Sequence, residues 1–237
     1  MAKTSSKGRL GLWLSRSVKI AVVALLAPLA IGVLRGVLDQ LDTTSLSGGT
    51  FRDWIAAGFM TYVWVHLLLA RPVRLFQASH RLFSILAVWL FGGQVASVED
   101  AGGKGKRGGG AGPEAGSPLV AFSPYVIPVT AILMCAAAWL LARWVDRAVL
   151  DGPMSFLIGL AASFHWLMTA DALQQQRGRW HVETYLLAIG LVFVVSLLLG
   201  GAALMLAVPE FSLGRALADG LAQAQGIYAT LVQRLFL

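Results

Sequence analysis

Charged residues are scarce in this chain. Only 13% of its 237 residues are lysine, arginine, aspartate or glutamate, whereas 57% are hydrophobic. A soluble domain of this length carries about 25% charged residues. The charges stand in blocks, and the apolar runs between them have the length of membrane spans. This pattern excludes an ordinary soluble domain and predicts an integral membrane protein.

Cysteine is almost absent. Cys135 is the one cysteine of the sequence, so the chain cannot form an intrachain disulfide. It stands inside an apolar run, where we expect a buried and unreactive thiol.

Acidic residues are outnumbered 12 to 19 by lysine and arginine, and the formal net charge is +7. In a membrane protein such an excess indicates basic loops that face anionic lipid headgroups. The sequence has no platform of interleaved aromatic and basic residues of the kind that binds nucleic acid. We therefore expect the lipid bilayer, and no nucleic acid, among the partners.

The apolar runs predict the fold. A helical span needs about 20 predominantly apolar residues. The runs do not alternate polar and apolar residues as barrel strands do, so they predict helices. The predicted fold is all-α, a polytopic membrane helix bundle of about six apolar segments. These segments are 20–38, 54–70, 82–97, about 125–144, 153–170 and 184–209. The run 82–97 is short, and both a tilted span and a re-entrant helix fit it.

Three parts of the chain differ in composition. Residues 1–19 contain five basic residues and no acid, which predicts a cytoplasmic N-terminus. Residues 20–209 form the predicted membrane domain, and the first run is longer than the core of a signal peptide, so we expect it to be retained. The Gly-rich segment 98–118 lacks the Gly-Lys-Ser/Thr ending of a phosphate-binding loop, which favours a solvated linker.

The tail, residues 210–237, predicts an amphipathic helix. Apolar residues recur in it at steps of three and four, and Ser212 is a plausible N-cap. We expect this helix to lie on the membrane or against the bundle, and a role in binding a partner stays open.

Histidine is the first candidate for chemistry. The chain has four, His66, His80, His165 and His181, and three of them stand in or at the edge of apolar runs. An ionisable residue in a membrane span is a functional-site hypothesis by default. A histidine at a helix edge, or one with an internal hydrogen bond, is the alternative for each.

The stretch "HRLFS" invites comparison with the zinc-binding motif His-Glu-x-x-His. His80 takes the first position, but Arg81 stands in place of the glutamate and Ser84 in place of the second histidine. Arginine cannot act as a general base, and its charge repels zinc. By its chemistry this stretch is a degenerate motif without catalytic residues.

The surroundings of this stretch nevertheless follow a known order. Gly92 and Gly93 follow His80 by twelve and thirteen residues, and a Leu-Asp-Gly triplet with Asp151 opens a later apolar run. Over about residues 60–185 the chain resembles the site-two-protease-like intramembrane zinc metallopeptidases. The resemblance implies that His80 and Asp151 match zinc-ligand positions, and that the protein is a bacterial inner-membrane protein. Because Arg81 and Ser84 depart from the motif, it implies an inactive relative.

Three functions fit these observations. The first is a non-catalytic scaffold that binds a membrane protein or peptide and holds no metal. The second is an active zinc enzyme with a rearranged site, in which His66, His80 and His165 converge and Asp151 or Asp171 completes the set. The third is a small transporter or channel subunit, although the sequence lacks the internal repeat that is common in transporters.

Overall fold

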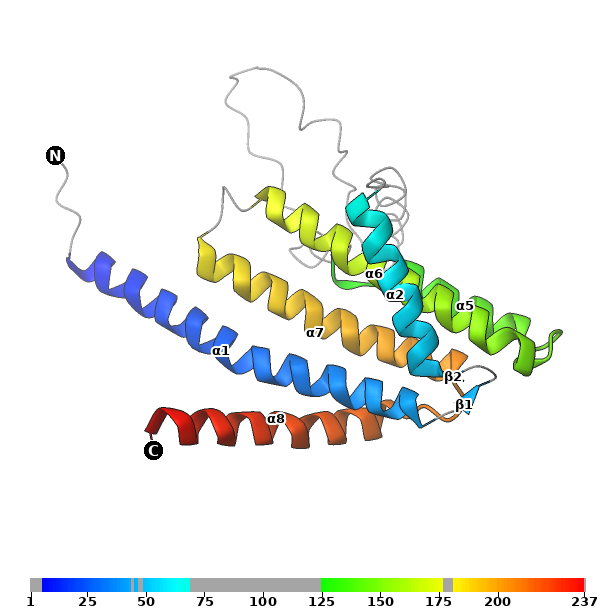
Figure 1. Ribbon diagram of the computed structural model, residues 1–237. Helices are drawn as coiled ribbons and strands as arrows, with labels where there is room; N and C mark the ends of the chain where they lie inside the picture. Colours follow the sequence, from blue (N-terminus) through cyan, green and yellow to red (C-terminus); the bar gives the residue numbers. More distant parts are fainter. Residues whose placement is uncertain (1–5, 44, 47–48, 69–124, 177–180, 237) are drawn as a thin grey trace, which may run out of the picture.

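The computed structural model describes residues 6–43, 45–46, 49–68, 125–176 and 181–236 (Figure 1). These residues form six helices and one short antiparallel hairpin. The helices are α1 (Ser6–Asp42), α2 (Phe51–Leu68), α5 (Val129–Leu141), α6 (Arg147–Gln176), α7 (Val182–Ala207) and α8 (Leu213–Phe236). The hairpin consists of β1 (Ser45–Leu46) and β2 (Gly49–Thr50), in which Ser45 pairs with Thr50.

The helices run alternately up and down along one bundle (Figure 1). Helices α1, α5 and α7 share one direction, while α2, α6 and α8 run the opposite way. The tight connections 43–50, 142–146 and 208–212 lie together at one end, which we call the turn end. Helix α1 begins and helix α8 ends toward the other end, which we call the terminal end.

Three of the described helical segments are long and apolar enough to cross a membrane, namely Trp13–Asp42, Arg147–Gln174 and Val182–Ala207. They support a membrane protein, but the expectation of six apolar segments is not met by the described residues. Helix α5 has 13 residues where we expected about 20, because Pro128 interrupts the helix before it and the chain turns after Leu141.

The structure describes some of the other expected segments and not the rest. Helix α2 begins at Phe51, and Arg52 and Asp53 occupy its first turn, so its apolar part is short. The predicted segment 82–97 and the Gly-rich segment 98–118 lie outside the described residues. The predicted amphipathic tail is the helix α8, which packs against the bundle along α1.

A capping box fixes the start of α2. The Asp53 carboxylate accepts hydrogen bonds from the Thr50 backbone N–H (2.9 Å) and hydroxyl (3.0 Å), and the Asp53 N–H donates to the Thr50 hydroxyl. These hydrogen bonds hold the pKa of the exposed Asp53 carboxyl below its usual value. The cap sets where α2 leaves the hairpin.

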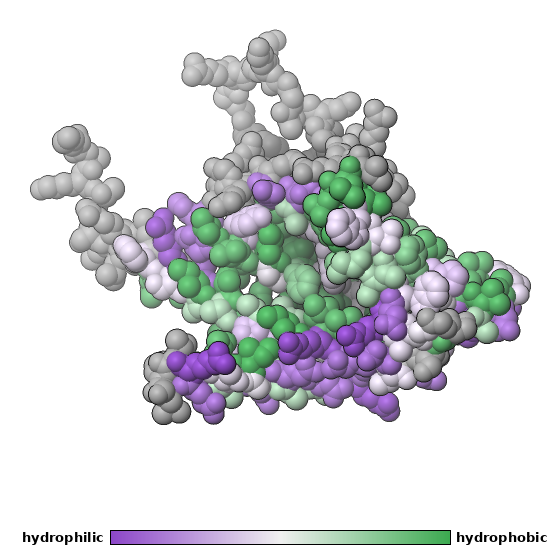
Figure 2. All heavy atoms as spheres, viewed as in Figure 1, coloured by the Kyte–Doolittle hydropathy of each residue, from purple (hydrophilic) through white to green (hydrophobic). Residues whose placement is uncertain are grey.

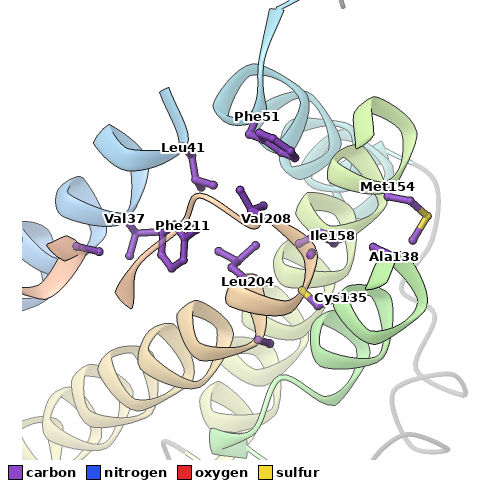
Figure 3. Packing of buried hydrophobic residues seen from close by; sticks show 13 residues of the cluster. Val37, Leu41, Phe51, Cys135, Ala138, Met154, Ile158, Leu204, Val208 and Phe211 are labelled. Carbon is purple, nitrogen blue, oxygen red and sulfur yellow. The ribbon is translucent and has the colours of Figure 1, made fainter. Parts of the chain in front are cut away.

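The main hydrophobic core lies at the turn end (Figure 3). Leu41 of α1, Phe51 of α2 and Val208 and Phe211 after α7 are buried together there. Cys135 of α5 is also buried in this cluster, as the sequence predicted. Because each described helix is joined to a neighbour by a tight turn at this end, this core ties the helix ends to one another.

Helices α2 and α6 are in backbone contact through two glycines. A Cβ atom on Gly58 would collide with the Phe156 carbonyl, and one on Gly159 would collide with the Ile55 carbonyl. Small residues permit such close approach between membrane helices. Trp54 beside Gly152 before these contacts, and Tyr62 beside Phe164 after them, show that the two helices run parallel.

The same device joins α1 and α8, in antiparallel orientation. Gly36 lies against the Ala216 carbonyl, and Gly32 lies against the Gly220 carbonyl. The Ser212 N–H donates a hydrogen bond to the Gln40 side chain (3.0 Å), and the Tyr228 hydroxyl donates to the Leu25 carbonyl. Helix α8 is thereby fixed beside the apolar part of α1.

Substitution of Gly36 tests this contact. Gly36→Ala should lower the stability of the detergent-solubilised protein by about 1–3 kcal/mol, because its methyl group overpacks the contact with α8. The matched control is Gly200→Ala in α7, where an added Cβ meets nothing within 4 Å. The control should be neutral or stabilising by up to about 1 kcal/mol, since alanine is the better helix former. Equal unfolding midpoints for the two variants would contradict the contact.

Candidate functional site

A buried histidine–carboxylate contact joins α2 and α6 near the terminal end. His66 Nε2 lies 3.3 Å from Asp171 Oδ2, and the side chains are 7% and 22% exposed. Both residues lie beyond the glycine contacts in the direction in which the two helices run, His66 eight residues after Gly58 and Asp171 twelve residues after Gly159. A paired histidine and carboxylate inside an apolar bundle is costly to bury and commonly functional.

Tyr62 completes the α2 side of this site. It lies one turn before His66, and the centroids of the two rings are 5.8 Å apart. Its other neighbour is Phe164 of α6, with centroids at 5.5 Å and ring planes at 85°. This edge-to-face contact contributes about 0.5–1.5 kcal/mol beyond burial and fixes the tyrosine ring.

Two polar atoms of the site lack hydrogen-bond partners. The Tyr62 hydroxyl and His66 Nδ1 are both buried, and neither finds a partner in the part of the chain that the structure describes. An unsatisfied buried group costs about 1–3 kcal/mol and calls for an explanation. The two atoms share one face of α2, and together they offer hydrogen bonds to a polar group that enters beside the partly exposed Asp171.

The other candidate residues lie elsewhere. His165 is buried in α6 six residues before Asp171, which places the two about 120° apart around the helix. Asp151 lies twenty residues before Asp171, or about 30 Å along the helix axis. The structure therefore brings His66 and Asp171 together and leaves His165 and Asp151 out of that contact.

Another set of candidate residues belongs to the degenerate zinc-binding motif and the Gly-Gly pair after it. His80, Arg81, Ser84, Gly92 and Gly93 all lie outside the described residues. Within the residues that are described, no three histidine, cysteine, aspartate or glutamate side chains lie close enough to hold a metal ion. Among the described residues, His66 and Asp171 bring two potential donor side chains together.

Tyr62 is the functional candidate that sequence reasoning missed. The signal for it was available, because Tyr62 and His66 stand four residues apart in an apolar run and so share one face of a helix. Asp171 entered the sequence analysis as one of two possible partners, and only the register of α2 and α6 selects it over Asp151.

We compared the chain with protein-family models, with curated proteins and with solved structures, and found no match to any of them.

The histidine–carboxylate contact can be tested by a double-mutant cycle on the free energy of unfolding. His66→Ala and Asp171→Ala should each destabilise the protein by about 1–3 kcal/mol, because each leaves a buried polar group without the side chain it contacts. The double variant should lose less than the sum of the two, with a coupling of about 0.5–3 kcal/mol. Strict additivity would show that the two side chains do not interact.

Proposed function

We propose that the protein is a non-catalytic membrane scaffold, which binds a segment of another membrane protein or peptide at the site formed by Tyr62, His66 and Asp171. The observation that carries the proposal is the pair of unsatisfied buried atoms, the Tyr62 hydroxyl and His66 Nδ1. In an apolar environment the backbone of an interrupted helix also needs hydrogen-bond partners. On binding, the site and such a segment supply each other with the missing hydrogen bonds.

The degenerate motif lacks the residues that would hydrolyse a peptide bond. Arg81 replaces the glutamate that activates water in the related peptidases, and Ser84 replaces a zinc ligand. The resemblance to the site-two-protease-like family therefore supports a protein that uses the binding groove of such an enzyme without its metal. The proposed function needs no cofactor.

We also propose a cytoplasmic terminal end, in a bacterial inner membrane. The connections at the turn end, 43–50, 142–146 and 208–212, contain one basic residue, Arg143. The N-terminal segment contains five basic residues, and the connection from α6 to α7 contains Arg177 and Arg179. Basic residues in short loops favour the cytoplasmic side.

Cysteine labelling tests this orientation in a Cys135→Ser background. A membrane-impermeant maleimide added outside intact cells should label Thr43→Cys at the turn end. It should not label Ser15→Cys until the cells are broken. Both positions are exposed in the structure, so accessibility within the protein does not bias the comparison. The reverse labelling pattern would refute the proposed orientation.

Photo-crosslinking in native membranes tests the scaffold. A photoreactive phenylalanine analogue at Tyr62 should form an adduct with an intact polypeptide, whereas the same analogue at Trp64 should label lipid. Trp64 is the matched control, because it lies two residues away on α2 and is 62% exposed. Adding His66→Ala should reduce the Tyr62 adduct about tenfold, because the analogue lacks the tyrosine hydroxyl and this change removes the remaining hydrogen-bonding group of the pair.

Two results would count against the scaffold. A polypeptide adduct that is equally abundant at Tyr62 and Trp64 would show that the site has no special role. Stoichiometric zinc in the purified protein that disappears in His80→Ala, together with cleaved adducts, would establish the rearranged metalloenzyme in its place.

A further inference from the structure

The outer face of α8 carries charged side chains at the level of the apolar run of α1. The contacts of Gly36 with Ala216 and of Gly32 with Gly220 fix how the two helices lie side by side. Residues 216–228 of α8 are therefore level with residues 25–36 of α1. Figure 2 shows hydrophilic side chains gathered along α8, below the hydrophobic surface of the neighbouring helices.

Several exposed charges of this region form no ion pair with another described residue. Arg35 of α1 and Arg215 and Asp219 of α8 are among them. Arg35 lies within the span-like segment of α1, where charged side chains almost always face protein or a water-filled cavity. The described chain supplies no acidic partner for Arg35, so another surface is needed there.

Opposite charges stand at the same level of the two helices. Asp219 adjoins Gly220 and is level with Val33, only two residues from Arg35. Two residues correspond to about 3 Å along a helix axis. Within one chain the two side chains do not pair. In a dimer whose two-fold axis is parallel to α1, each residue has the same height along the axis in both copies. Arg35 of one copy can therefore meet Asp219 of the second copy, and symmetry makes this contact occur twice in each dimer.

The surface also permits close approach. Ala222 and Gly226 follow Asp219 by three and seven residues on the same exposed side of α8, and a Cβ on Gly226 would meet nothing within 4 Å. Beside them an open groove of about 460 Å³ runs between α1 and α8, with Arg35 and Arg234 among its lining residues. Small residues and a groove of this kind suit a packed helix.

We propose that the outer face of α8 and the adjoining groove form a homodimer interface, in which Arg35 of each copy pairs with Asp219 of the other. Helices α1 and α8 of the two copies then make a four-helix bundle with antiparallel neighbours. Charge complementarity selects a second copy as the occupant, because this face supplies both charges at one depth. The interface is separate from the site at Tyr62 and His66, so it stands or falls independently of the scaffold function.

Co-expression of two single-cysteine chains tests the interface directly. Full-length Arg35→Cys and Asp219→Cys chains, each with Cys135→Ser and a different tag, should form a mixed disulfide in native membranes under mild oxidation. The matched control replaces Arg35→Cys by Leu206→Cys, which is exposed on α7. The control should give at most about a tenth of the mixed product, since a tenfold preference needs only a modest interface energy.

Charge reversal tests the pair itself, by energy transfer between labelled copies diluted in lipid vesicles. Arg35→Asp and Asp219→Arg should each weaken dimerisation about tenfold, and the double variant should return to within about threefold of the native chain. Equal mixed disulfides with the Leu206→Cys control, an adduct of Asp219→Cys with a different protein, or singly reversed chains that dimerise as well as the native one would each overturn the proposal.

Discussion

Close backbone contact between helix pairs is the constraint on which this structure depends. Gly58 and Gly159 bring α2 against α6, and Gly32 and Gly36 bring α1 against α8. In a membrane the helices gain little from hydrophobic burial against one another, so packing of this kind decides how they associate. A glycine contact is also specific in register, because a slip of one turn would place a side chain where only a hydrogen atom fits.

The register then determines where the polar groups lie. In the pair α2–α6 it sets His66 opposite Asp171 and keeps Asp151 about 30 Å away along the axis of α6. In the pair α1–α8 it sets Asp219 at the level of Arg35. One packing device therefore accounts both for a buried polar site near the terminal end and for a charged outer face on α8, although the two surfaces serve different proposed partners.

The sequence predicted the type of secondary structure better than the lengths of the helices or the contacts between them. Apolar runs correctly predicted helices over most of the described chain. The apolar residues at steps of three and four in 210–237 predicted an amphipathic helix. The sequence did not predict the 13-residue length of α5. A continuous apolar run does not show whether a proline within it, here Pro128, kinks the helix or interrupts it. Nor did the sequence select Asp171 over Asp151, since that choice depends on backbone contacts between α2 and α6, about a hundred residues apart in the chain.

The register of α2 against α6 is the central claim, and disulfide formation measures it most directly. In a Cys135→Ser background, the double variant His66→Cys/Asp171→Cys should crosslink rapidly within one chain in native membranes. The pair His66→Cys/Leu167→Cys, which reports a slip of about one turn, should not. A faster crosslink to position 167 than to position 171 would contradict the register, and with it the site at Tyr62 and His66.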